Sequence, residues 1–107
     1  MKLKAGLLTM FLHITDGKHL EEYKVEVAFN NGKRGIADLS EALHGPVFEL
    51  LKNQETFSSF IVDTDLETLV WPIWPNGADL APEYIFFQAF KNDTELQEQF
   101  RLWKYIS

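Results

Sequence analysis

The side chains that could do chemistry in this chain are carboxylates, three histidines and a few hydroxyls, because it contains no cysteine. The lack of cysteine excludes a disulfide framework, a thiolate metal site and a cysteine nucleophile. No two of His13, His19 and His44 are three or four residues apart, the spacing that ligates a metal from one helix face. The sequence also has no Gly-x-Ser-x-Gly motif. We therefore predict that the chain is not an enzyme and has no catalytic residue, metal or cofactor.

A second place for chemistry is the acidic run Asp63, Asp65 and Glu67, whose alternation would put three carboxylates on one face of an extended chain. A helix-loop-helix calcium site counted from Asp63 needs glycine at its sixth position and glutamate at its twelfth. Those positions hold Thr68 and Trp74. The sequence therefore predicts a solvated acidic loop here.

Charge is concentrated in the middle of the chain, whose formal net charge is −6. Residues 1–34 carry a net +2, residues 35–90 carry −8 with Lys52 as their one basic side chain, and residues 91–107 are balanced. An acidic surface argues against direct nucleic-acid binding, which needs clustered Lys and Arg. It favours a basic or neutral protein partner. A face that only keeps the protein soluble is the alternative.

The most unusual cluster is the Trp- and Pro-rich segment 71–83. Exposed tryptophan is favoured at the energetic centres of binding surfaces. The residues that we expect to contact a partner are Trp71, Trp74, Asn76, Asp79 and Glu83. The alternative is that both indoles pack over a sheet while Asp79 caps the following helix.

These patterns are compatible with three functions. The first is a non-catalytic protein-interaction domain that binds its partner through segment 71–83 and the acidic face. The second is a regulatory or antitoxin-like protein that neutralises a basic partner encoded next to it. The third is a small hydrolase that uses carboxylates, although no pair of them stands out in the sequence.

These residues must be positioned by strands and short helices. Residues 23–29 alternate in polarity, which predicts a strand with one buried face. Asn-Gly within 30–32 predicts a tight turn with positive φ at both central residues, and 33–37 returns as the partner strand. Residues 40–52 favour two short helical pieces broken at Gly45-Pro46.

The second half repeats this order. Residues 60–63 and 68–71 predict a second pair of strands, and 82–90 predicts a helix with a proline in its first turn. Residues 93–106 predict a C-terminal helix that either folds back on its own domain or supplies a homodimer contact. The tripeptide Ala-Asp-Leu occurs at 37–39 and again at 78–80, which hints at a repeated topology.

The apolar run 7–14 predicts a buried first strand, because it lacks a signal-cleavage site and is shorter than a membrane span. We therefore expect a cytoplasmic protein that does not enter a membrane. The whole chain, residues 1–107, is expected to form one α+β domain. Its sheet would have four or five antiparallel strands, with helices packed on one face and an extra C-terminal helix.

Two segments together resemble a bacterial family known as domain of unknown function 2442. They are GIADLS at 35–40, followed by Gly45-Pro46-Val47-Phe48, and WPNGADLAPE at 74–83. The resemblance covers about residues 10–90 and implies a small α+β domain with no established activity. Some relatives carry an added helix-turn-helix domain that binds DNA, and others are encoded beside a second small protein. The residues after Phe90 are too few for such a domain, so we expect no DNA binding by that route.

Overall fold

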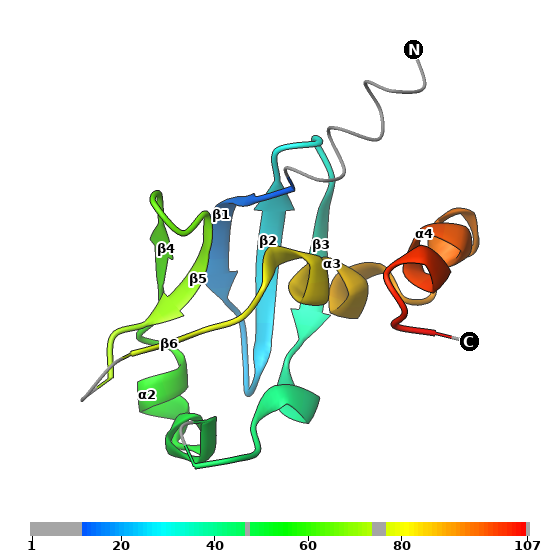
Figure 1. The fold of residues 1–107 in the computed structure, drawn as a ribbon. Helices are drawn as coiled ribbons and strands as arrows, with labels where there is room; N and C mark the ends of the chain where they lie inside the picture. The colour runs from blue at the N-terminus through cyan, green and yellow to red at the C-terminus, as the bar shows by residue number, and fades with distance from the viewer. Residues whose placement is uncertain (1–11, 47, 74–76, 107) are drawn as a thin grey trace.

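The fold, seen in a computed structural model that describes residues 12–46, 48–73 and 77–106, has its strands in two antiparallel sheets (Figure 1). The first sheet has the order β1-β2-β3 and the second has the order β4-β5-β6. The strands are β1 (Ile14–His19), β2 (Lys24–Phe29), β3 (Arg34–Asp38), β4 (Ile61–Asp63), β5 (Thr68–Trp71) and β6 (Ala78–Asp79). The helices are α2 (Gln54–Phe57), α3 (Pro82–Phe90) and α4 (Gln97–Leu102), with the 3₁₀ helices η1 (Ser40–Ala42), η2 (Phe48–Lys52) and η3 (Thr94–Leu96). The predicted α+β class is confirmed, although the strands divide between two small sheets.

The hairpin β2–β3 is confirmed where the alternating pattern predicts it. Val25, Val27 and Phe29 are buried on one face of β2. The turn differs from the two-residue turn that Asn-Gly suggests. The N–H of Gly32 donates to Phe29 O and the N–H of Phe29 donates to Lys33 O, which encloses a three-residue loop. Only Gly32 in this loop has positive φ, at 87°, as this longer type of hairpin loop requires.

The described first strand extends beyond the end of the predicted range. Residues 7–11 of the predicted strand 7–14 lie outside the described residues, and β1 begins at Ile14. The polar stretch after it continues the strand: Gly17 lies opposite Val27 and His19 opposite Val25. This strand therefore forms because it pairs with β2. Its mostly polar side chains give no alternating pattern from which the sequence could predict it.

The second sheet is built from a hairpin and a very short third strand. The Asp63 carboxylate accepts hydrogen bonds from the N–H groups of Asp65 at 2.8 Å and Leu66 at 2.9 Å, which fixes the loop between β4 and β5. On either side of this loop, β4 and β5 confirm the strands predicted at 60–63 and 68–71. β6 was not predicted, because two paired residues give no periodic pattern.

The two sheets meet where β1 passes the hairpin β4–β5, beside it in Figure 1. One backbone hydrogen bond crosses this junction, from Ile14 N–H to Glu67 O at 2.9 Å. A glycine lies in the middle of β1, and a Cβ placed on Gly17 would come within 3.0 Å of Leu69 Cδ2 and 3.3 Å of the Phe60 ring. The small residue lets the side chains of the second sheet pack directly on the first strand.

Helix α3 covers the first sheet. Phe86 contacts Phe29 edge to face at 5.0 Å between ring centroids, and Phe90 lies over Gly35. The helix begins with Pro82 in its first turn, as predicted. Asp79 does not cap it, contrary to the alternative for that residue, because Asp79 belongs to β6 and the N-cap residue is Ala81.

The C-terminal segment packs back on α3. Phe100 is fully buried against Phe86 and Phe87, with ring centroids 6.2 and 5.0 Å away. The C-terminal helix predicted over about 93–106 is present as η3 followed directly by α4, but α4 ends at Leu102, earlier than expected, before Lys104 adopts φ 66°. A homodimer contact through this helix stays a prediction.

Candidate functional site

Among the described residues of the partner site predicted from the sequence, Trp71 is buried rather than exposed. Trp71 is 0% exposed, and its Nε1–H donates to Phe57 O at 2.7 Å. Its ring also contacts Phe57 and Phe60 at 5.6 and 6.0 Å between centroids. The prediction that Trp71 anchors a partner is therefore wrong. Its position in β5 turns it into the core, where the indole N–H finds a backbone acceptor.

The other predicted contact residues lie in different places. Trp74 and Asn76 lie outside the described residues. Asp79 is exposed on β6. Glu83 is half-buried in the first turn of α3. Burial raises the pKa of the Tyr105 hydroxyl, and the Glu83 carboxylate adds to this effect, so Glu83 faces the C-terminal segment.

The second sheet presents an outer face turned away from β1. Val70 lies directly opposite Ile61 on one side and Asp79 on the other, so the three side chains form one row across the sheet. Ile61 is 50% exposed, which is unusual for a large apolar side chain in a strand. The next residue of β4 on the same face is Asp63. We call Ile61, Val70, Asp79 and Asp63 the outer face of the second sheet.

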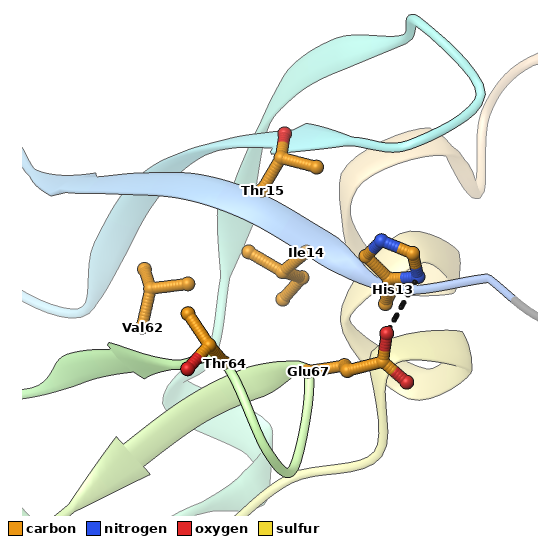
Figure 2. A pocket seen from close by; sticks show the side chains of 6 residues that line it. All are labelled: His13, Ile14, Thr15, Val62, Thr64 and Glu67. Carbon is orange, nitrogen blue, oxygen red and sulfur yellow. Dashed lines mark ion pairs between the residues drawn. The ribbon is translucent and has the colours of Figure 1, made fainter.

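A cleft of about 290 Å³ opens between β1 and the β4–β5 hairpin (Figure 2). Its lining residues are His13, Ile14, Thr15, Val62, Thr64 and Glu67. His13 Nδ1 lies 3.1 Å from Glu67 Oε2. Figure 2 shows the hydroxyl oxygens of Thr15 and Thr64 pointing away from the imidazole, so neither hydroxyl is placed to act as a nucleophile beside His13.

The His13 backbone is held as well as its side chain. The N–H of His13 donates to Asn30 Oδ1 at 2.9 Å, and the N–H of Asn30 donates to His13 O at 3.0 Å. The pair of His13 with Glu67 therefore joins the start of β1 to the loop of the second sheet. Sequence reasoning missed it, since the two residues are far apart and neither belongs to a recognisable motif.

A second cleft, of about 280 Å³, lies beside the end of β3 and is lined by Glu22, Tyr23, Lys24, Asp38 and Ser40. The pKa of the Asp38 carboxyl is lowered, chiefly by hydrogen bonds from the backbone N–H and the hydroxyl of Ser40. The Ser40 N–H lies 3.0 Å from Asp38 Oδ1. Asp38 is thus kept charged as a hydrogen-bond acceptor, which is a structural role.

Metal ligands are dispersed in the part of the chain that the structure describes. Among residues 12–46, 48–73 and 77–106, no group of three or more His, Asp or Glu side chains could hold a metal ion. Within those residues, the helices are also too short or too polar to span a bilayer.

The described fold defines a small α+β domain in which two three-stranded meanders share one core. The family model described as "Protein of unknown function (DUF2442)" matches residues 14–91, and the chain belongs to this family. The match ends before η3 and α4. Among curated proteins and solved structures, no significant match was found.

Proposed function

We propose that this chain is a non-catalytic protein-interaction domain that holds a basic partner on the outer face of its second sheet. The observation that carries the proposal is the row Ile61, Val70 and Asp79, which places a half-exposed apolar side chain and an exposed carboxylate on one surface. A surface of this composition suits a segment with an apolar side chain next to Lys or Arg. Asp79 keeps its predicted role in this proposal, and Ile61 replaces Trp71 as the apolar anchor.

The charge around this face supports a basic partner. Residues 35–90 carry nine carboxylates and the single basic residue Lys52. The loop next to the face adds Asp65 and an exposed Leu66. A field of one sign raises the association rate of an oppositely charged protein and disfavours acidic ones.

The two clefts described above support a role without catalysis. In one, the lowered pKa of Asp38 is the opposite of the raised pKa that a general acid needs. In the other, His13 is paired with Glu67 while the neighbouring hydroxyls point elsewhere. Both clefts thus use their titratable groups to join elements of the fold.

The experiment is capture of partners from an extract of the source cells by the full chain, with recombinant confirmation of the protein captured. We expect the variant Ile61→Ser with Asp79→Lys to lose at least tenfold in affinity, by biolayer interferometry. The matched control is Leu50→Ser with Glu98→Lys, because Leu50 is 53% exposed on η2 and Glu98 is exposed on α4, both away from the face. Equal binding by both variants, or no protein specific to the wild type, contradicts the proposal.

The alternative proposal is a regulatory or antitoxin-like protein. Its acidic surface would neutralise a basic protein encoded beside it. Co-expression of the chain with the protein of the adjacent gene tests this alternative directly. A neighbour that is acidic, or that purifies apart from this chain, contradicts it while leaving the first proposal to the capture experiment.

A further inference from the structure

The first sheet ends at β3, and the pairing of β3 with β2 determines which of its backbone N–H and C=O groups point outward. Residues of β2 and β3 pair antiparallel, with Val27 opposite Gly35 and Val25 opposite Ala37. Hydrogen bonds from Phe29 N–H to Lys33 O and from Leu39 N–H to Tyr23 O fix which pairs are bonded. Bonded and non-bonded pairs alternate in an antiparallel ladder. The residues in between, Arg34, Ile36 and Asp38, therefore point their N–H and C=O groups away from β2.

This edge is open in the part of the chain that the structure describes. No described residue hydrogen-bonds to the backbone of Arg34, Ile36 or Asp38. Ile36 in the middle of the strand is 52% exposed. Proteins commonly protect an edge strand with proline, a bulge or covering structure, and the described β3 has neither of the first two.

The edge strand is also packed against α3, and its charged side chains follow a fixed order along the strand. On the helix-covered face, a Cβ on Gly35 would meet the Phe90 ring at 2.8 Å, so α3 supports the strand from close by. On the other face, Arg34, Ile36 and Asp38 carry an exposed positive, apolar and negative side chain in that order. The Arg34 guanidinium also lies 3.7 Å from the carboxylates of Asp16 and Glu26. A strand added here would meet this series at alternate positions.

We propose that the β3 edge accepts an extended segment of a partner protein as an antiparallel fourth strand of the first sheet. The segment would present a basic residue opposite Asp38, an apolar residue opposite Ile36 and an acidic residue opposite Arg34. Antiparallel pairing lets each of these three residues exchange two backbone hydrogen bonds with the residue directly opposite. Opposite charges at directly paired positions add to sheet stability.

A second copy of this chain matches the charge series, because an antiparallel β3 would place Asp38 opposite Arg34. The helix layer argues against that occupant. Since α3 packs over Gly35 in the middle of β3, a two-fold partner would bring its own α3 over a strand about 5 Å away. Packed helices need about 8–10 Å between their axes. A partner segment without a helix on that side avoids this collision.

The probe is a capped peptide with the core Lys-Thr-Ile-Thr-Glu, and the control peptide has the reversed core Glu-Thr-Ile-Thr-Lys. Both are titrated into the ¹⁵N-labelled full chain. We expect the first peptide to bind at least tenfold more tightly. On binding, the amides of Arg34, Ile36 and Asp38 should exchange with D₂O at least tenfold more slowly, whereas those of Gly35 and Ala37 are already protected in the free protein.

Two variants keep the test independent of folding. Ile36→Pro removes an outward N–H together with the isoleucine side chain, and an edge strand tolerates proline, so it should abolish binding while the melting temperature stays close to that of wild type. Ile36→Thr keeps the N–H and should weaken binding much less. A further variant, Arg34→Glu, should prefer a peptide that carries Lys at its last core position.

Three results would overturn the proposal. Equal affinity for both peptides would show that the charges of Arg34 and Asp38 do not select the bound sequence. Slow exchange of the Arg34, Ile36 and Asp38 amides in the free protein would show that the edge is already covered by its own chain. A dimer in analytical ultracentrifugation that Ile36→Pro dissociates would assign the edge to a second copy. None of these results bears on the outer face of the second sheet, so the two proposals fail separately.

Discussion

The two sheets of this molecule use the same tripeptide differently. Each is a meander whose third strand runs into Ala-Asp-Leu, at 37–39 in the first sheet and 78–80 in the second. In the first sheet Asp38 accepts the N–H of Ser40, and the leucine is fully buried. In the second sheet Asp79 is exposed and its leucine is only half-buried. The residue after each tripeptide decides its role, because Ser40 offers a hydroxyl donor beside its backbone N–H, whereas Ala81 at the equivalent position has no side-chain donor.

The sheets also differ in how they are attached to the rest of the core. The first has strands of five or six residues covered by α3. The second has strands of two to four residues, and its Trp71 reaches α2 through Phe57. Short strands make few ladder bonds, so we infer that the second sheet depends more on a single large side chain.

The largest effect should come from Trp71→Ala, which removes that side chain. Because Trp71 is fully buried, the substitution should lower the free energy of unfolding by about 3–5 kcal/mol, measured by urea denaturation. Trp71→Phe keeps much of the packing and loses the hydrogen bond to Phe57 O, so it should cost less. A loss below about 1 kcal/mol for Trp71→Ala would mean that the second sheet does not depend on this residue.

The two leucines of the repeated tripeptide give the next effect. Leu39 is 0% exposed, so Leu39→Ala should lower the free energy of unfolding by about 2–5 kcal/mol. Leu80→Ala removes the same atoms from a half-buried position and should cost about 1 kcal/mol. Equal losses in parallel urea melts would show that the two tripeptides are equivalent after all.

Alanine substitutions at Gly35 and Gly17, the glycines on which other elements pack, should differ less in their effect on the free energy of unfolding. A Cβ at Gly35 meets the stiff Phe90 ring at 2.8 and 2.9 Å, whereas one at Gly17 meets the movable end of Leu69 at 3.0 Å. Gly35→Ala should therefore cost about 1–3 kcal/mol, and Gly17→Ala less. Thermal unfolding followed by circular dichroism would rank them, and the reverse order would refute this account of how α3 packs.

The smallest expected effect is the difference in stability between alanine variants of Asp38 and Asp79 as the pH changes. The hydrogen bonds from Ser40 lower the pKa of Asp38 below its ordinary value of 3.8. Its stabilising contribution is therefore complete above that value and is lost as the pH falls through the lower pKa of the folded state. Asp38→Ala should cost about 1 kcal/mol at pH 7 and progressively less in acid. Asp79→Ala is the matched control, because within the described residues no hydrogen bond reaches its carboxylate.

Local patterns predicted the elements that depend on local interactions. The alternation in 24–29, the glycine turn at 32 and the first-turn proline of α3 all lie where the sequence places them. Pairing between distant segments was not predictable in the same way. β6 and the polar strand β1 exist because a neighbouring strand supplies their hydrogen bonds, which no periodicity records.

The candidate site shows the same division. Composition located the acidic half of the chain, but it could not tell whether Trp71 faces outwards, because that depends on the side of β5 that meets the core. Ile61 and Ile36 carry no signal in sequence, since an exposed isoleucine in a strand resembles a buried one until the register is known.

The meander order of both sheets has a consequence for how the chain folds. Each strand in the described sheets pairs with its neighbour in sequence, so most of the ladder forms between segments that are already close along the chain. Low contact order of this kind favours folding within milliseconds. The junction of Ile14 with Glu67 joins distant segments, and its loop closure is the entropically expensive step. We therefore expect the two halves to acquire structure before they dock, which makes docking the rate-limiting event.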